Sequence, residues 1–195
     1  GSSKLLAERI TLNSNLRKGF KKTIFSVVRF GNVIGSRGSV VPQFVSQIKS
    51  KKNLTLTHKK TTRYFVTIKE AVNCVMTAIN EMRGGEIFLP KNIRSIQIYE
   101  LANVIISFFK KTKSKIIVTG LRENEKLHEK IISENEQQML KEFKNVFILD
   151  TQKKHSIKKS IKLKNYFSSK KLNFLNNKML LSYLLKNKLL DKNTN

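Results

Sequence analysis

The chain has 195 residues, of which 39% are hydrophobic and 27% charged, and its formal net charge is +26. This length suffices for one or two small domains with a core, and the composition is that of a globular protein. No apolar run is long enough to span a bilayer and no signal sequence opens the chain, so we expect a cytoplasmic protein with no membrane partner.

The positive charge is typical of nucleic-acid-binding proteins, but its distribution argues against specific binding. The chain has 31 Lys and 8 Arg, whereas recognition of base edges and forked contacts to phosphate favour Arg. The lysines are spread along the whole chain. We therefore expect no specific nucleic-acid partner, only weak, salt-sensitive association with polyanions.

The first half of the chain predicts helices separated by short strands. Residues 2–18 have helical spacing of Leu5, Leu12 and Leu16 with Arg9 on the same face, and Gly19 ends the helix. A nearly continuous apolar run at 23–30 predicts a strand covered on both faces. The next expected elements are a helix at 41–50, strands at 54–57 and 63–66, and a helix from about residue 68 with Val72, Val75, Met76, Ile79 and Met82 inward.

The second half continues the alternation. Gly84 and Gly85 end the preceding helix, and the elements expected after them are strands at 86–89, 115–118 and 146–149 and helices at 97–111, 125–132 and 179–189. This alternation predicts an α/β fold with a partly parallel sheet. We expect residues 1–150 to form the globular part. Residues 151–195, with 12 Lys and one Asp, are expected to be a Lys- and Asn-rich segment with a terminal helix.

Two kinds of site are not predicted. Cys74 is the one cysteine of the chain, so an internal disulfide is excluded, and its place in an expected helix favours a buried, unreactive thiol. The three histidines, His58, His128 and His155, are too scattered for a metal site. Gly31, Gly35 and Gly38 do not have the spacing of a dinucleotide-binding fingerprint, and no other Gly-rich strand-to-helix turn occurs.

The segment 29–44, Arg-Phe-Gly-Asn-Val-Ile-Gly-Ser-Arg-Gly-Ser-Val-Val-Pro-Gln-Phe, carries the clearest functional signal. A strand, a glycine-bearing polar loop and a helix are how α/β sheets build ligand crevices. Amides at the helix start can bind an anion, and Asn32 and Arg37 can add side-chain donors. The loop is therefore predicted to form one wall of a site for a phosphorylated ligand.

Four segments resemble one protein family when they are taken together. They are 28–42, Thr62-Arg-Tyr-Phe-Val-Thr67, 84–91 and Gly120-Leu-Arg-Glu-Asn-Glu-Lys-Leu-His-Glu129, with weaker similarity at 142–149 and 166–169. Their order and sequence resemble the C-terminal half of extended short-chain dehydrogenases/reductases. More narrowly, they resemble the CapD-like nucleoside-diphosphate-sugar 4,6-dehydratases, above all the inverting UDP-N-acetylglucosamine 4,6-dehydratases of the pseudaminic-acid pathway.

The resemblance implies the C-terminal part of a Rossmann-type fold with a small substrate-binding subdomain, without the dinucleotide-binding half. In the family, bound NADP (NAD in some members) takes hydride from sugar C4, water is lost across C5 and C6, and hydride returns to C6. The catalytic Tyr would immediately precede Gly1, and Lys4 would lower its pKa and hydrogen-bond the nicotinamide ribose. Alternatively, residues 1–3 are a cloning scar and Lys4 is an ordinary surface lysine.

The resemblance also assigns binding roles. Asn32 would hydrogen-bond the substrate, Val33 would lie beside the sugar and the nicotinamide, and Arg37 would contact the pyrophosphate or cofactor, unless it is a surface arginine. Arg63 and Arg122 would contact the UDP phosphates, and Glu125 the ribose hydroxyls. The family's Arg-Pro-Gly-Glu-Lys motif here reads Arg122-Glu-Asn-Glu-Lys126, and loss of the Pro-Gly turn is expected to weaken binding.

The leading hypothesis is the substrate-binding half of a UDP-sugar 4,6-dehydratase, inactive alone, with a UDP-sugar as ligand, no metal, and a homo-oligomer when full length. A 4-epimerase or a retaining dehydratase of the same superfamily remains an alternative, because the residues that separate these reactions lie in the other half. Two further alternatives are a basic nucleic-acid-binding protein and a non-functional remnant of a longer protein.

Overall fold

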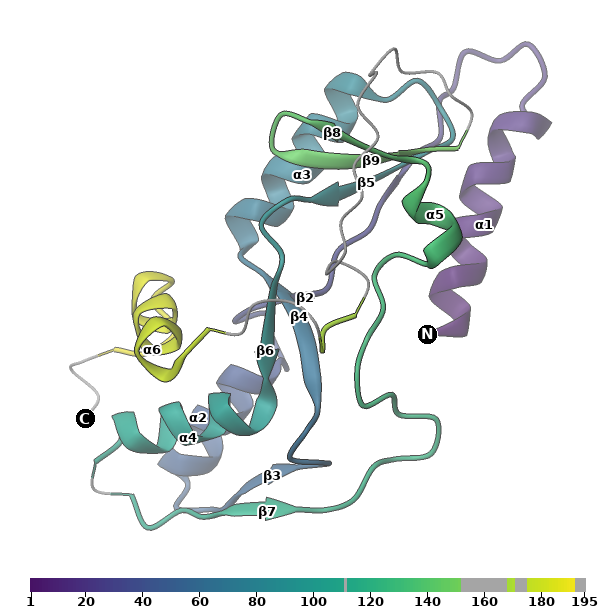
Figure 1. The fold of residues 1–195 in the computed structure, drawn as a ribbon. Coiled ribbons are helices and arrows are strands. Elements are labelled where there is room, and N and C mark those ends of the chain that lie inside the picture. The colour runs from purple at the N-terminus through teal and green to yellow at the C-terminus, as the bar shows by residue number, and fades with distance from the viewer. Residues whose placement is uncertain (111, 152–167, 171–174, 192–195) are drawn as a thin grey trace. The chain divides into compact units, whose positions relative to one another are not determined.

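The computed structural model describes residues 1–110, 112–151, 168–170 and 175–191 (Figure 1). The chain divides into two units, each assembled from three separate stretches of sequence. Unit 1 contains Gly1–Phe30, Ile68–Asn92 and Ile131–Phe167, and unit 2 contains Gly31–Thr67, Ile93–Lys130 and Ser168–Asn195.

Within the described residues, unit 1 is built on one sheet with the strand order β1-β5-β9-β8. Its strands are β1 (Val27–Val28), β5 (Glu86–Pro90), β8 (Leu140–Phe143) and β9 (Val146–Asp150), and its helices are α1 (Ser2–Arg17), α3 (Ile68–Glu81) and α5 (Glu134–Gln137). β1 runs parallel to β5, whereas β9 is antiparallel to both β5 and β8.

The strand predicted at 23–30 is confirmed only in part. Only Val27 and Val28 are in regular strand pairing. Two backbone hydrogen bonds extend beyond them: the Phe25 carbonyl accepts from the Gly85 amide at 2.9 Å, and the Arg29 amide donates to the Phe88 carbonyl at 2.8 Å. The expected burial on both faces is wrong. Val27 and Val28 are only half-buried, and among the described residues β1 is an edge strand that pairs with β5 alone.

Helix α3 begins at Ile68, as predicted, but the face it buries is not the expected one. Ala71, Cys74 and Ala78 are buried, and the last two pack with Phe88 and Ile148. Small side chains let a helix approach a sheet closely, and burial raises the pKa of the Cys74 thiol to about 12, as fits an inert thiol. The larger apolar residues remain 38–71% exposed: Ile68, Val72, Val75, Met76 and Ile79.

Helix α1 also has the predicted bounds and an unexpectedly open face. Of the four residues predicted to share one face, Leu12 is buried, whereas Leu5 is 54% and Leu16 76% exposed. Within unit 1, helices α1 and α3 therefore both carry apolar side chains that the described residues leave uncovered.

Arg29 ties three parts of unit 1 together. Its guanidinium donates to Glu8 of α1 at 2.9 Å through Nε, to Glu136 of α5 at 2.8 Å and to the Ile131 carbonyl at 2.9 Å. Burial by itself would lower the pKa of Arg29, but the hydrogen bonds with Glu136 and Glu8 raise it overall. The side chains of Arg29, Glu8 and Glu136 are 18%, 10% and 17% exposed, so this is a largely desolvated ion pair.

Within the described residues, unit 2 contains two small sheets and a hydrophobic core. Its strands are β2 (Asn32–Val33), β3 (Leu54–Leu56), β4 (Thr62–Val66), β6 (Arg94–Gln97) and β7 (Ile116–Val118), and its helices are α2 (Val40–Lys49), α4 (Ile98–Phe108) and α6 (Asn177–Lys186). The sheets have the orders β2-β4-β6 and β3-β7. Phe44 of α2, Leu101 and Ile105 of α4 and Leu184 of α6 are buried in one core, and Figure 1 shows α2 beside α4.

The helix predicted at 125–132 is wrong. Residues 122–130 instead run beside β4, where the Thr62 amide donates to the Leu127 carbonyl at 3.0 Å. Strands β2, β6 and β8 and helix α5 are additional elements that the sequence pattern did not predict.

The described part of residues 151–195 is divided between the units. Residues 168–170 and helix α6 group with unit 2, and Leu180 and Leu184 of α6 lie in its core. The segment 152–167, with His155, lies outside the described residues. None of the helices that the structure describes is both long and apolar enough to cross a membrane.

Candidate functional site

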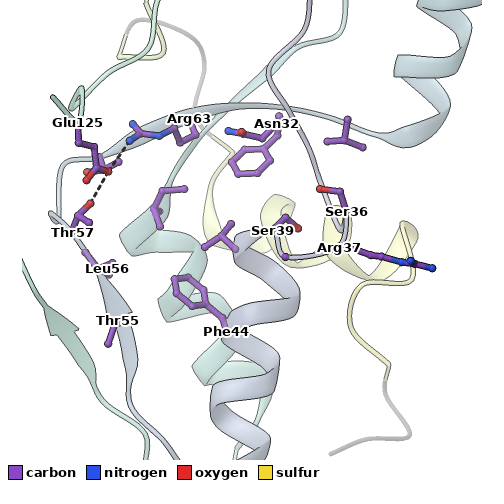
Figure 2. A pocket seen from close by; sticks show the side chains of 16 residues that line it. Asn32, Ser36, Arg37, Ser39, Phe44, Thr55, Leu56, Thr57, Arg63 and Glu125 are labelled. Atoms are coloured by element: carbon purple, nitrogen blue, oxygen red, sulfur yellow. Dashed lines mark hydrogen bonds and ion pairs between the residues drawn. The ribbon is translucent and has the colours of Figure 1, made fainter. Parts of the chain in front are cut away.

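Unit 2 contains a pocket of about 430 Å³ at the start of α2 (Figure 2). It is lined by four stretches that are distant in sequence: the β2–α2 segment, the β3–β4 segment, Ile98 at the start of α4, and Glu125. The lining residues are Asn32, Val33, Ser36, Arg37, Gly38, Ser39, Val40, Phe44, Thr55, Leu56, Thr57, Thr61, Arg63, Phe65, Ile98 and Glu125.

The glycine-bearing loop is positioned by β2. Asn32 and Val33 pair in parallel with Phe65 and Val66 of β4, and the Ile34 amide donates to the Val66 carbonyl at 2.9 Å. Gly31 has no room for a side chain, because an added Cβ would lie 2.5 Å from the Tyr64 Cβ and 2.6 Å from its carbonyl oxygen. The glycine is therefore needed for close packing of two strands, not for an anion cradle.

The loop ends at the N-terminus of α2, which lines the pocket. Gly38 has a φ of +72°, a conformation that glycine adopts without strain, and Ser39 is the N-cap of the helix. Unpaired amides and the positive end of the helix dipole make a helix start favourable for a phosphate group. Ser39 Oγ and Thr61 Oγ1 are buried polar atoms without a hydrogen-bond partner among the described residues, so the pocket wall offers two unused hydroxyls.

Arg63 is the most constrained cation of the pocket. Its Nη1 donates to the carbonyls of Thr62 and Lys126, both at 2.9 Å, and more weakly to that of Leu127. Its Nη2 donates to Glu125 Oε1 at 2.9 Å, and its Nε lies 3.5 Å from Glu129 Oε1. Most of the guanidinium donors are thus engaged by the protein itself, which leaves Arg63 few N–H groups for a ligand.

Glu125 connects Thr57, which follows β3, with Arg63 of β4. Besides Arg63, it accepts from the Thr57 hydroxyl at 2.9 Å and from the Arg122 amide at 3.2 Å. Burial alone would raise the pKa of Glu125, but the hydrogen bonds from Arg122 and Thr57 and the charge of Arg63 lower it below its usual range. Glu125 is therefore ionised at neutral pH.

The structure brings together five of the seven residues predicted for the site. Asn32, Val33, Arg37, Arg63 and Glu125 line the pocket, although Figure 2 shows the Arg37 side chain extending away from the other labelled side chains. Arg122 is exposed and is not among the lining residues. Lys4 is an exposed residue of α1 in unit 1.

Sequence reasoning missed several hydroxyl residues of the pocket. Thr55 and Thr57 alternate with Leu54 and Leu56, which are buried, in and just after β3. Alternation of polar and apolar residues does predict which side of a strand is open. However, nothing in the sequence indicates that Thr57 faces Glu125.

The turn before Glu125 is kept despite the Glu123-Asn124 departure from the family motif. The Glu125 amide donates to the Arg122 carbonyl at 3.0 Å, and Asn124 has a φ of +62°. Asn tolerates this left-handed conformation better than other non-glycine residues. A turn therefore still forms at residues 122–125, and the weaker binding expected from the departure stays a prediction.

A substitution at Asn124 tests this interpretation. Asn124→Val should lower the free energy of unfolding by about 1–2 kcal/mol, because a β-branched residue is strained at positive φ. Asn124→Gly should be neutral or slightly stabilising. Urea unfolding of the two variants measures the difference, and an unaffected Val variant would show that the turn does not hold this conformation in solution.

The described residues do not form a dinucleotide cradle. The glycine-bearing strand-to-helix segment that they contain is β2–α2, and its Gly31 serves strand packing. They also contain no group of three or more His, Cys, Asp and Glu side chains that could hold a metal ion. Lys4 and Val33 alone would not hold NADP.

The chain matches known proteins over most of its length. Residues 1–151 match the family described as "Polysaccharide biosynthesis protein". The UDP-N-acetylglucosamine 4,6-dehydratase (inverting) of Campylobacter jejuni is 38% identical over 91% of this chain and 49% of its own length. The uncharacterized membrane protein MJ1061 of Methanocaldococcus jannaschii is 44% identical over 76% of this chain and 46% of its own. A UDP-glucose 4-epimerase of Rickettsia canadensis is 38% identical to this chain, and the match covers 68% of this chain and 38% of the epimerase.

Solved structures support the fold. The X-ray structure of Pen from Bacillus thuringiensis superposes with a TM-score of 0.87 and 31% identity, covering 98% of this chain and 58% of that one. dTDP-glucose 4,6-dehydratase from Bacillus anthracis in complex with NAD superposes with a TM-score of 0.51 and 20% identity, over 63% of this chain and 40% of its own, a likeness of fold alone.

These matches confirm two expectations, the α/β fold of the short-chain dehydrogenase type and the resemblance to nucleotide-sugar dehydratases. The chain spans about half the length of the curated relatives it matches. On the family match and the shared fold, the chain belongs to the polysaccharide biosynthesis protein family that includes the nucleotide-sugar 4,6-dehydratases.

Proposed function

We propose that this chain is the substrate-binding half of a UDP-N-acetylglucosamine 4,6-dehydratase and that it binds the UDP group in the unit 2 pocket. The observation that carries the proposal is the convergence of Asn32, Arg63 and Glu125 from three distant segments on one cavity at a helix N-terminus. A diphosphate needs positive charge and amide donors, and a ribose needs hydrogen-bond acceptors. Arg63 with the start of α2 supplies the first, and Glu125 supplies the second.

The chain by itself is proposed to bind but not to catalyse. The family's reaction needs a nicotinamide cofactor, and the described residues lack its cradle. The relatives carry about as much additional sequence as they share with this chain. The exposed apolar residues Val72, Met76 and Ile79 of α3 offer a surface that such additional elements would cover. Lys4 and Val33 are proposed to face the nicotinamide in the complete protein, which we propose to be a homo-oligomer.

Calorimetric titration with UDP tests the binding function. UDP should bind with an affinity well above that for inorganic phosphate, because phosphate lacks the ribose that Glu125 would contact. Equal affinity for UDP and phosphate would mean that the chain binds only anions, and the absence of UDP binding would overturn the proposal.

Arg122 has a smaller expected share in binding. We predict that Arg122→Ala weakens UDP binding about 3- to 10-fold, because an exposed arginine near the pocket contributes a screened charge. Arg17→Ala is the control, since it removes the same charge from an exposed position in unit 1. If the two variants bind UDP equally, Arg122 has no specific role.

A 4-epimerase is the second candidate, because a UDP-glucose 4-epimerase also matches the chain at 38% identity. The two activities share a UDP site and differ in the chemistry of the other half. Incubation of a complemented, full-length protein with UDP-N-acetylglucosamine and NADP separates them: a 4-keto-6-deoxy product indicates the dehydratase, and the 4-epimer indicates the epimerase.

A further inference from the structure

Ser169 is a fully buried hydroxyl residue that the pocket does not contain. Its amide donates to the Glu129 carbonyl at 2.9 Å, and its Oγ accepts from the Glu129 amide, also at 2.9 Å. The same Oγ lies 2.6 Å from Thr62 Oγ1, and the Ser169 carbonyl accepts from the Ser95 hydroxyl. One residue of the C-terminal segment is thus bonded to β4, to β6 and to the segment 127–129.

The partners of Ser169 flank the arginine of the pocket. Thr62 directly precedes Arg63 in β4, and its amide donates to the Leu127 carbonyl. Glu129 contacts the Arg63 side chain and also accepts weakly from the Tyr64 amide at 3.4 Å. The carbonyls of Lys126 and Leu127 that orient the guanidinium therefore belong to a segment that Ser169 fastens at its far end.

His128 completes the cluster on the solvent side. Its Nδ1 lies 2.8 Å from Thr62 Oγ1, which places Thr62 between the imidazole and the Ser169 hydroxyl. Partial burial and the positive charges of Lys170 and Arg63 lower the pKa of His128 below its usual range. The neutral ring can accept the Thr62 proton, so the hydroxyls of Thr62 and Ser169 both have partners at neutral pH.

We propose that Ser169 is a positioning residue of the pocket: it pins residues 127–129 against β4 and thereby fixes the Arg63 guanidinium that contacts the ligand. Ser169 touches no ligand itself. The effect on UDP rests on the proposed function, whereas the pin can be measured without any ligand.

Hydrogen exchange of the full chain tests the pin directly. In Ser169→Ala the partly buried Glu129 amide loses its acceptor, so the peptides covering residues 125–129 should exchange at least about tenfold faster than in the wild type. Ser168→Ala is the matched control, because among the described residues the Ser168 hydroxyl accepts just one 3.3 Å bond, from the Lys170 amide. Unchanged exchange in Ser169→Ala would overturn the proposal.

Titration with UDP tests the positioning role. Ser169→Ala should weaken UDP binding about tenfold, Ser168→Ala should leave it unchanged, and the loss should disappear when Arg63→Ala is already present, because Ser169 acts through Arg63. Additive losses in the double variant would overturn the positioning role. If the wild-type chain binds no UDP, the proposed function is contradicted instead. The hydrogen-exchange result then decides by itself whether Ser169 holds residues 127–129 against β4.

A second pair of variants keeps the proposal testable if Ser169→Ala does not fold. Thr62→Ser keeps the bridging hydroxyl and should behave as the wild type in both measurements. Thr62→Val removes the hydroxyl at similar volume and should reproduce the faster exchange and the weaker binding. Equal behaviour of the two variants would contradict the proposal.

Discussion

Arg29→Ala should lower the free energy of unfolding by about 3–5 kcal/mol. Removal of the guanidinium leaves the carboxylates of Glu8 and Glu136, which are only 10% and 17% exposed, without a counter-ion. The Ile131 carbonyl loses its donor as well. Urea unfolding followed by circular dichroism measures the change.

Two control variants separate charge from geometry. Arg9→Ala removes an arginine from an exposed position of α1 and should change stability by less than about 0.5 kcal/mol. Arg29→Lys keeps the charge but cannot reach both carboxylates with a fork, so its loss should be intermediate. A loss in Arg29→Ala no larger than in Arg9→Ala would show that the ion pair does not form in solution.

The same ion pair predicts a pH dependence with a definite sign. Burial opposes ionisation of Glu136, but hydrogen bonds with Arg29 and from the Ser133 amide lower its pKa below the ordinary value of 4.5. A carboxyl with a lowered folded-state pKa contributes stability above pH 4.5 that is lost as the pH falls through the folded-state pKa. The stability difference between wild type and Arg29→Ala should therefore be constant near pH 7 and shrink below about pH 4.5.

Arg63→Ala should combine a loss of stability with a loss of ligand. The guanidinium holds the carbonyls of Thr62 and Lys126 and the carboxylate of Glu125, so its removal should cost about 2–4 kcal/mol of unfolding free energy. Under the proposed function, UDP affinity should fall on the order of 100-fold, equivalent to about 2.7 kcal/mol.

Arg63→Lys is the informative control for this position. A lysine ammonium keeps the charge but cannot bond to both carbonyls and the carboxylate in a fixed plane. It should therefore retain only part of the UDP affinity, measured by calorimetry at a temperature at which both variants are folded. UDP affinity equal to the wild type in Arg63→Ala would remove Arg63 from the site.

The sequence predicted the elements whose signals are local. Apolar periodicity and flanking glycines located α1, α2, α3 and α4 to within a few residues, because these signals act within one or two helical turns. The order of the family motifs also identified the family, which the match over residues 1–151 confirms. The loop at 31–38 and Arg63 lie in these motifs, so the motifs also predict them as candidate site residues.

The sequence did not predict features that depend on distant partners. Residues 125–132 contain helix-favouring Glu, Lys and Leu. However, their backbone carbonyls accept hydrogen bonds from Thr62 and Arg63 of β4, and these bonds compete with the hydrogen bonds of a helix. Strands β6 and β8 carry charged and polar residues whose strand conformation is fixed by pairing with β4 and β9, respectively.

The sequence by itself determined the α/β alternation, the family and the residues that belong to the family's motifs, because each of these is written in short stretches of chain. Only the tertiary structure decided which face each helix buries and which motif residues meet. It turned the large apolar residues of α3 outward because small Ala71, Cys74 and Ala78 allow closer packing, the last two against the sheet of unit 1. It also brought Glu125 to Arg63, and Ser169 to Thr62, across more than 60 and 100 residues of chain.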